Sequence, residues 1–240
     1  MSRRLVLLRH GESEWNRDQR FTGWADVGLT ELGAAQMQEA GQVLRQAEIR
    51  IDVAFTSVLK RAIQSTWQVL DSMDCCWLPL QLDWRLNERH YGALTGLSKS
   101  SAVDQFGMDA VQAWRRAYEA RPPEADARAV RHIPIDGRYA TILPERIPRA
   151  ESLQQTASRV HEVWEAAIAP RLQAGDTALV LSHGNTLRAL IGLLEQLSPQ
   201  ELVDLNVPNG VPTIYELDEQ WTVLRRRELL VSRATRSAVL

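Results

Sequence analysis

Short uninterrupted apolar runs occur at several points of the chain and predict buried β-strands. Such runs are typical of strands that are covered on both faces, as in parallel sheets. The strands predicted in this way are residues 5–8, 52–56, 78–82 and 178–181. Pro79 weakens the third prediction, because proline cannot donate a hydrogen bond to a neighbouring strand. Two more strands are predicted near the C-terminus, at residues 213–217 and 221–225.

Between the strands, apolar residues recur at helical spacing. The pattern predicts helices over residues 30–46, from residue 57 onward, over 98–119 in two pieces, and over 152–168 and 186–194. We expect Thr30 and Ser57 to cap the first two helices, and Leu32 to lie on the buried side of the first. Because strands and helices alternate, the predicted fold class is α/β with a largely parallel sheet.

The length of the chain suits one domain that carries an insertion. At roughly 150 residues per domain, 240 residues are too few for two average units. The alternation of strands and helices breaks over residues 98–149, and five of the ten prolines lie between residues 121 and 148. A long segment of this kind in a compact domain is usually functional. We expect it to pack over the core, and a tail to begin near residue 228.

Composition and charge narrow the function classes. The chain is 45% hydrophobic and 24% charged, which excludes a disordered or fibrous protein. Its net charge of −2 lacks the positive excess on which non-specific nucleic-acid binding depends. No apolar run approaches the roughly 18 residues of a membrane span or the length of a signal peptide core. The adjacent Cys75 and Cys76 cannot join distant segments and suit a reducing compartment. We expect a cytoplasmic protein.

Two of the predicted strands run directly into a His-Gly pair. LVLLRHG ends in His10, and ALVLSHG ends in His183. Ligands of open α/β sheets bind beyond the carboxyl ends of the strands, so the two histidines are expected to face each other if the strands are neighbours. Two histidines are too few for a metal site, and no HExxH motif is present. We therefore expect no metal.

Arginines near these histidines favour an anionic ligand instead. Arg9, Arg61 and Arg188 follow strands or begin helices on the same side of the predicted sheet, and guanidinium groups match phosphate oxygens in pairs. A neutral imidazole beside a bound phosphate is a competent nucleophile. Glu88 follows the third strand and is the candidate general acid. These residues predict phosphoryl transfer at a histidine.

Six motifs in order resemble the cofactor-dependent phosphoglycerate mutases of the histidine phosphatase superfamily. They are LLRHGESEWN, FTGWADVGLTELG, TSVLKRA, LNERHYGALTGL, WRR and SHGNTLRAL, and the similarity runs from about residue 5 to residue 217. RHG alone indicates only the superfamily. ERHYG, followed by Lys99 and the Arg115–Arg116 pair, indicates the mutase branch. The resemblance implies one domain over residues 1–240, with a mostly parallel sheet and helices on both faces.

The resemblance also implies roles for individual residues. His10 would be the phosphorylated nucleophile, Glu88 the proton donor and acceptor, and His183 a stabiliser of the transition state. Residues expected around the phosphate are Arg9, Gly11, Ser13, Asn16, Thr22, Gly23, Arg61, Gly184 and Asn185. Residues expected to hold the rest of the substrate are Arg89, Tyr91, Lys99, Arg115 and Arg116. Ser98, Ser101 and Asn209 depart from the family pattern.

The function implied is the interconversion of 3-phosphoglycerate and 2-phosphoglycerate in glycolysis and gluconeogenesis. Bisphosphoglycerate (2,3-bisphosphoglycerate) would prime His10, no metal would take part, and the protein would be a homodimer without nucleic-acid or membrane partners. One alternative is a phosphatase of the same superfamily that hydrolyses a small phosphorylated metabolite; it is expected to have a shorter insertion. A second alternative is a non-catalytic module that binds a phosphorylated ligand.

Overall fold

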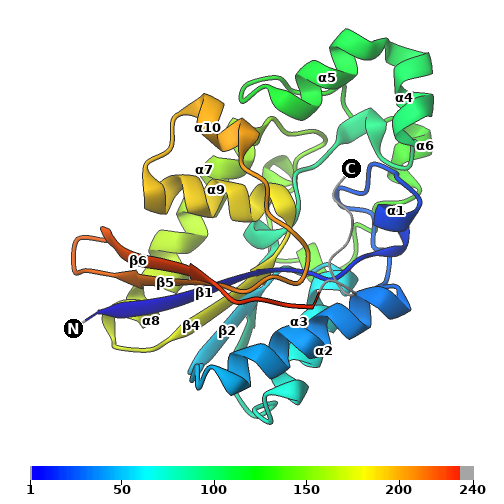
Figure 1. The fold of residues 1–240 in the computed structure, drawn as a ribbon. Coiled ribbons are helices and arrows are strands. Elements are labelled where there is room, and N and C mark those ends of the chain that lie inside the picture. The colour runs from blue at the N-terminus through cyan, green and yellow to red at the C-terminus, as the bar shows by residue number, and fades with distance from the viewer. Residues whose placement is uncertain (1, 233–240) are drawn as a thin grey trace.

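A six-stranded sheet forms the centre of the protein (Figure 1). The structure is a computed structural model that describes residues 2–232. The strands lie in the order β3 (Leu80–Leu82), β2 (Val53–Thr56), β4 (Ala178–Ser182), β1 (Arg3–Arg9), β5 (Thr213–Leu217) and β6 (Val223–Glu228). The first four are parallel, whereas β5 and β6 are antiparallel to their neighbours. The predicted α/β fold with a mostly parallel sheet is confirmed.

Helices cover both faces of this sheet, as expected (Figure 1). Because side chains alternate along a strand, Val6 and Leu8 of β1 pack on one side and Leu5 and Leu7 on the other. The first side is covered by α2 (Glu31–Gln46) and α3 (Lys60–Ser72). The second is covered by α7 (Leu153–Val163), a π-helical turn (Trp164–Ile168), α8 (Ala169–Gln173) and α9 (Gly184–Glu195). The central strands are buried on both sides, which explains their uninterrupted apolar runs.

The helix caps agree with the sequence pattern at one position and not at another. Thr30 caps α2, because its Oγ accepts a hydrogen bond from the Gly33 amide at 3.0 Å. Ser57 does not cap α3; that helix has Leu59 at its N-cap position without a side-chain cap. The expectation for Leu32 was wrong, since it is 38% exposed. The reason is that the small Gly33 faces inward against the backbone of Glu12, which turns its neighbour outward.

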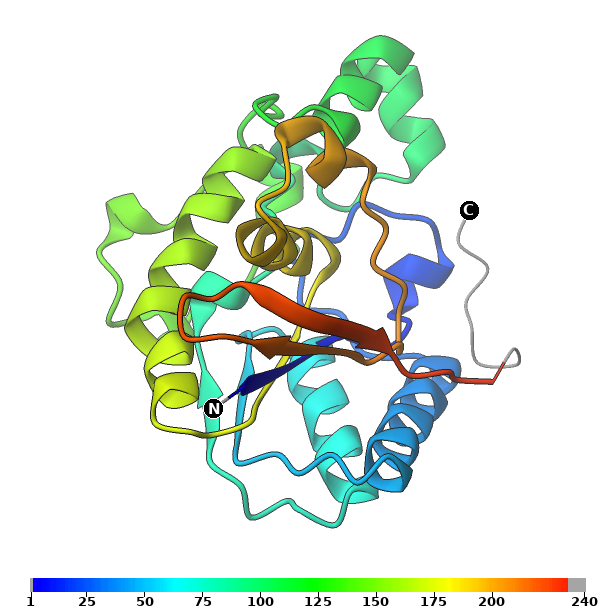
Figure 2. The same ribbon diagram turned by 60° about the vertical axis from the view of Figure 1, so that its left-hand side comes forward.

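The predicted insertion forms short helices beyond the carboxyl ends of the parallel strands (Figures 1 and 2). Residues 98–119 form two helices, as predicted: α4 (Lys99–Phe106) and α5 (Met108–Arg116). Gly107 separates them at a φ of 83°, which a residue with a side chain adopts at a cost. The helix α6 (Ala127–Val130) and the 3-10 turns Gly137–Tyr139 and Pro144–Arg146 follow.

Some elements were not predicted. They are the helices α1 (Glu14–Arg17) and α10 (Pro199–Asp204) and the 3-10 turns Trp84–Leu86 and Gly92–Leu94. The expected tail starts at the end of β6, and its residues 233–240 lie outside the described residues. The single-domain organisation stays a prediction. Within residues 2–232, no helix combines the length and the apolar character that crossing a membrane requires.

Candidate active site

The two His-Gly pairs lie side by side at the carboxyl edge of the sheet. Strands β1 and β4 are parallel neighbours, with Arg9 paired to Ser182 in the register. The rings of His10 and His183, one residue further on, have their centroids 4.9 Å apart at an interplanar angle of 64°. Both rings are buried. The expectation that the two histidines face each other is confirmed.

The contacts of His10 place the lone pair of its ring on Nε2, the nitrogen that can act as a nucleophile. Its Nδ1 lies 2.6 Å from the carbonyl oxygen of Gly11, which can only accept a hydrogen bond, so Nδ1 carries the hydrogen. Burial holds the pKa of His10 well below its usual value, and the nearby charges of Arg61 and Arg9 lower it further. The ring is therefore neutral at pH 7. Its lone pair is on Nε2, which accepts a hydrogen bond from Arg61 Nε at 3.3 Å.

The guanidinium of Arg61 is held against His10 by backbone carbonyls. Its two terminal nitrogens donate to the carbonyl oxygens of Ala25 and Gly23, each at 2.9 Å. Burial lowers the pKa of Arg61 to about 10, so the group remains charged at neutral pH. A phosphoryl group on His10 Nε2 would lie beside this fixed cation.

The other two candidate arginines differ from each other. Arg9 uses one nitrogen to donate to the carbonyl of Val207 at 2.7 Å, while its buried Nε has no hydrogen-bond partner. Arg9 also packs against Gly184 at the start of α9. Arg188 instead donates to the carbonyl of Leu205 at 2.6 Å. We conclude that Arg9 can donate a hydrogen bond to an anion, and that Arg188 stabilises the loop after α10.

Glu88 lies across the same site, with one carboxylate oxygen already bound. Its Oε1 accepts hydrogen bonds from the backbone amide of Arg89 at 2.8 Å and from both the amide and the side chain of Asn185 at 3.1 Å. The side chain of Asn185 also donates to the hydroxyl of Tyr91. These donors orient the carboxylate and leave Oε2 for a substrate proton.

A cavity of about 180 Å³ joins these groups. It is lined by Arg9, His10, Asn16, Arg20, Phe21, Thr22, Gly23, Arg61, Glu88, Tyr91, Lys99 and Arg115. All but Arg20 and Phe21 were predicted as site residues. Arg20 was not predicted as a site residue. Candidate residues were sought at the ends of predicted strands, whereas Arg20 follows the short helix α1. A cavity of this size and polarity suits a small phosphorylated molecule.

The remaining predicted residues lie around this cavity without lining it. Gly11 and Ser13 shape the loop after β1: Gly11 packs on the backbone of Gly33, and Ser13 caps α1. Arg89 stacks on the ring of Tyr91 with its guanidinium carbon 4.8 Å from the centroid. Two of the nitrogens of Arg89 are buried without a partner. His183 lies behind His10.

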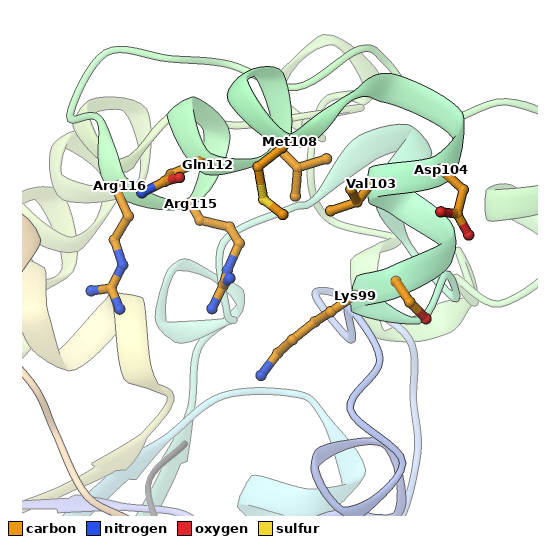
Figure 3. Close-up of a pocket in the computed structure, with 9 residues that line it drawn as sticks. Lys99, Val103, Asp104, Met108, Gln112, Arg115 and Arg116 are labelled. Carbon is orange, nitrogen blue, oxygen red and sulfur yellow. The ribbon is translucent and has the colours of Figure 1, made fainter.

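A second cavity, of about 560 Å³, opens between α4 and α5 (Figure 3). Lys99 and Arg115 line both cavities, and Arg116 lines the second one alone. Burial lowers the pKa of Lys99, and the charges of Arg115 and Arg116 lower it further. Across residues 2–232, no carboxylate lies within ion-pair distance of these three cations. The insertion therefore presents unneutralised positive charge at the mouth of the site.

A buried ion pair supports the loop that carries Glu88. Arg159 of α7 binds Glu151 at 2.6 Å, with side chains 6% and 4% exposed. Arg159 also donates to the carbonyls of Asn87 and Glu88, at 2.8 and 2.9 Å. The Trp24 indole donates to the Glu88 carbonyl as well. The members of the pair are eight residues apart, but sequence patterns did not reveal its role, because its contacts with the Glu88 loop join segments about 70 residues apart.

Replacing Arg159 by alanine should destabilise the protein strongly. The change leaves the Glu151 carboxylate buried without its partner, and removing one member of a buried pair typically costs about 3–5 kcal/mol. Urea unfolding followed by circular dichroism measures the loss. The exposed pair of Arg146 and Glu162 provides the control, because Arg146→Ala should cost less than about 1 kcal/mol. Equal losses in the two variants would contradict a supporting role for Arg159.

Another positioning contact was also missed. Asn209 donates from its side-chain amide to the carbonyl oxygen of His10 at 2.6 Å, and the amide of Gly210 donates to the carbonyl of Arg9 at 3.1 Å. The departure from the family pattern at Asn209 therefore lies directly on the backbone of the nucleophile.

As to metals, the described part of the chain contains no group of three or more His, Cys, Asp or Glu side chains that could hold an ion.

Several solved structures, among them two that are phosphatases by name, are similar to this chain over nearly its full length. Mycobacterial glucosyl-3-phosphoglycerate phosphatase bound to inorganic phosphate is 25% identical, with a TM-score of 0.69, and the match covers 98% of this chain and 100% of that one. The α-ribazole phosphatase of Shigella flexneri is 23% identical, with a TM-score of 0.67 and coverage of 92% and 94%. YhfR of Bacillus stearothermophilus is 24% identical, with a TM-score of 0.70 and coverage of 92% and 93%.

These matches correct one expectation. A phosphatase was expected to be shorter in the insertion, yet the mycobacterial phosphatase matches along its whole length. The extent of the insertion therefore does not separate a mutase from a phosphatase. A model of the histidine phosphatase superfamily (branch 1) matches residues 5–133 and 136–229. With the paired histidines, the fixed arginine and the oriented glutamate in place, the chain belongs to the histidine phosphatase superfamily, branch 1.

Proposed function

We propose that the protein transfers the phosphoryl group of a small phosphorylated metabolite to Nε2 of His10. The observation that carries this proposal is the neutral ring of His10, whose Nε2 lone pair lies 3.3 Å from the fixed Arg61 cation. The substrate's P–O bond breaks as the N–P bond forms. Arg61 and Arg9 stabilise the negative charge on the transferring oxygens, which is the main source of catalysis in phosphoryl transfer.

Glu88 handles the proton of this reaction. In its protonated form it gives its proton to the substrate oxygen that leaves phosphorus, which yields a free hydroxyl and a carboxylate. In the second half of the cycle the carboxylate takes a proton from the hydroxyl or water that attacks the phosphohistidine. The donors on Oε1 of Glu88 support this role, because they fix the carboxylate in one orientation.

The cations of the insertion support a substrate with a second anionic group. Lys99 and Arg115 line the cavity of His10 and lack carboxylate partners among the described residues. Phosphoglycerate carries a carboxylate besides its phosphate, and bisphosphoglycerate carries a further phosphate. We therefore propose phosphoglycerate mutase activity, in which bisphosphoglycerate primes His10 and is held while its other phosphate turns toward the histidine. A homodimer stays a proposal.

A phosphatase is the second candidate, and the solved structures favour it. Two of the similar structures are named as phosphatases, one of them a glucosyl-3-phosphoglycerate phosphatase. The first half of the reaction is the same. In the second half water attacks the phosphohistidine and inorganic phosphate leaves. The acceptor of the phosphoryl group is thus the point at which the two candidates differ.

One assay distinguishes the candidates. The protein is incubated with 3-phosphoglycerate, with and without added bisphosphoglycerate, while 2-phosphoglycerate and free phosphate are measured together. A mutase forms 2-phosphoglycerate in amounts far above free phosphate, and only efficiently after priming. A phosphatase releases phosphate without isomerisation. If neither product forms and no phosphohistidine is trapped from either compound or from a panel of other phosphate monoesters, the non-catalytic alternative holds.

Removing Arg115 and Arg116 together should change the balance between the products. The double alanine variant loses charge-assisted contacts to the far end of bisphosphoglycerate, each worth about 1.5–3 kcal/mol. We expect isomerisation to fall about tenfold or more, while free phosphate per turnover rises because the intermediate escapes to water. The two products are measured as above.

A matched double variant controls for the loss of charge. Arg225→Ala with Arg227→Ala removes the same charge from the exposed strand β6, and both products should remain at their original rates. If the Arg115 and Arg116 variant loses both activities in equal proportion, the pair serves general binding, and the mutase proposal loses this support. If isomerisation is unchanged, the pair has no part in holding the intermediate.

A further inference from the structure

Ser57 makes a contact that its place in the sequence did not predict. Its Oγ lies 2.7 Å from Nε2 of His183, and both side chains are fully buried. Ser57 directly follows β2, which is the neighbour of β4 on the side away from β1. The ring of His183 therefore has Ser57 on one side and the ring of His10 on the other. The second nitrogen of His183, Nδ1, is buried without a hydrogen-bond partner.

The hydrogens of this cluster can be assigned from the contacts. The backbone amide of Leu59 lies 3.2 Å from Ser57 Oγ, and an amide can only donate. Oγ accepts that hydrogen bond with one lone pair. Among residues 2–232 its other hydrogen-bond contact is His183 Nε2, so Nε2 is the acceptor that this contact offers to the buried hydroxyl hydrogen. Burial holds the pKa of His183 well below its usual value, and Arg61 and His10 lower it further. A neutral imidazole ring carries one N–H hydrogen. Because Nε2 accepts a hydrogen bond, this hydrogen is on Nδ1.

We propose that Ser57 is a positioning residue that holds His183 in the tautomer with its hydrogen on Nδ1, ready to donate to the phosphoryl group at His10. This inference rests on the proposed phosphoryl transfer. The opposite tautomer would present a lone pair from Nδ1 to the negatively charged phosphoryl oxygens and would repel them. The proposal also explains why His183 Nδ1 has no hydrogen-bond partner within the protein. Its acceptor is the phosphoryl oxygen, which is present when substrate is bound.

The tautomer is measurable without any substrate. In protein labelled with ¹⁵N at its five histidines, the ring signals show which nitrogen bears the hydrogen, and the His183→Gln variant identifies the signals of His183. We expect the wild-type ring to carry its hydrogen on Nδ1 and to accept at Nε2. A hydrogen on Nε2 in the wild type would overturn the proposal before any variant of Ser57 is made.

Variants then test whether Ser57 sets the tautomer. Ser57→Ala should convert His183 to a mixture of tautomers or to the Nε2 form, whereas Ser57→Thr keeps the hydroxyl and should restore the Nδ1 form. Thr66→Val is the matched control, since it removes a buried hydroxyl whose hydrogen bond goes to the Ala62 carbonyl within α3. An unchanged His183 signal in the folded alanine variant would contradict the proposal. If the alanine variant does not fold, the threonine variant and the wild-type spectrum still decide it.

The kinetic consequence is specific to the chemical step. Losing one hydrogen-bond donor to the transition state typically lowers the rate about 10²–10³-fold. The loss in Ser57→Ala should be smaller, because part of the His183 population keeps its hydrogen on Nδ1. We expect Ser57→Ala to slow phosphorylation of His10 about 10- to 100-fold while KM changes less than about threefold. A shifted tautomer with an unchanged rate would refute the catalytic part. If the wild type forms no phosphohistidine while the tautomers behave as expected, the proposed function fails and the assignment of Ser57 stands.

Discussion

Replacing His10 by alanine should abolish acid-labile labelling of the protein by bisphosphoglycerate labelled with ³²P. The lone pair on Nε2 of His10 lies against Arg61, and His10 lines the cavity whereas His183 is not among its lining residues. Without His10 no covalent intermediate forms, so turnover of the phosphorylated substrate should fall below detection. Acid-labile phosphate on the intact protein is measured by mass spectrometry after a short incubation.

His161 provides a matched control for this experiment. It lies on α7 with a half-exposed side chain, paired with Glu165 at 3.4 Å and remote from the site. His161→Ala should keep full labelling and turnover. Undiminished label in the His10 variant would remove His10 from the mechanism, and label that moves to His183 would show that the second histidine accepts the phosphoryl group directly.

Glu88→Gln should slow turnover by about 10²–10⁴-fold, the usual contribution of a general acid or base. Glutamine has the same shape and can still accept the hydrogen bonds from Arg89 and Asn185, so the site should stay assembled. Its amide cannot supply a proton to the leaving oxygen. The effect should therefore lie in kcat, with KM nearly unchanged, and steady-state kinetics separate the two.

The exposed Glu162 serves as the control for this change. Glu162→Gln removes a carboxylate that pairs with Arg146 at the surface, and its kcat should equal that of the wild type. A loss of less than about tenfold in the Glu88 variant would assign the proton transfer to another group. A large rise in KM would instead show that Glu88 mainly organises the binding site through Asn185.

The strands and the mostly parallel character of the sheet could be predicted from the sequence because their signals are local, whereas the order of the strands came from the structure. Runs such as residues 5–8 and 178–181 are apolar without interruption because the strands are buried on both faces. The parallel pairing of β1 and β4 then brings His10 and His183 together, since the carboxyl ends of neighbouring parallel strands meet at one edge. The position of Glu88 after the third predicted strand made it the candidate general acid, and the family resemblance added the cations of the insertion, which no periodicity indicates.

The length of the insertion was a misleading signal for function. Residues 98–149 were expected to distinguish a mutase from a phosphatase, yet a phosphatase matches the chain throughout. What separates the two activities is whether water reaches the phosphohistidine and whether the intermediate is retained. We propose that individual side chains, such as Arg115 and Arg116, decide both properties, and not the extent of a segment.

The sequence by itself determined the strands, the main helices and the residue types that meet at the carboxyl edge of the sheet. Only the tertiary structure decided which arginine approaches His10, that Arg188 binds backbone instead of facing the cavity, and that Ser57 pairs with His183 instead of capping α3. The physical reason is the range of the interactions. Helix and strand periodicity arises between residues a few positions apart, whereas each of these hydrogen bonds depends on how separate elements pack in three dimensions.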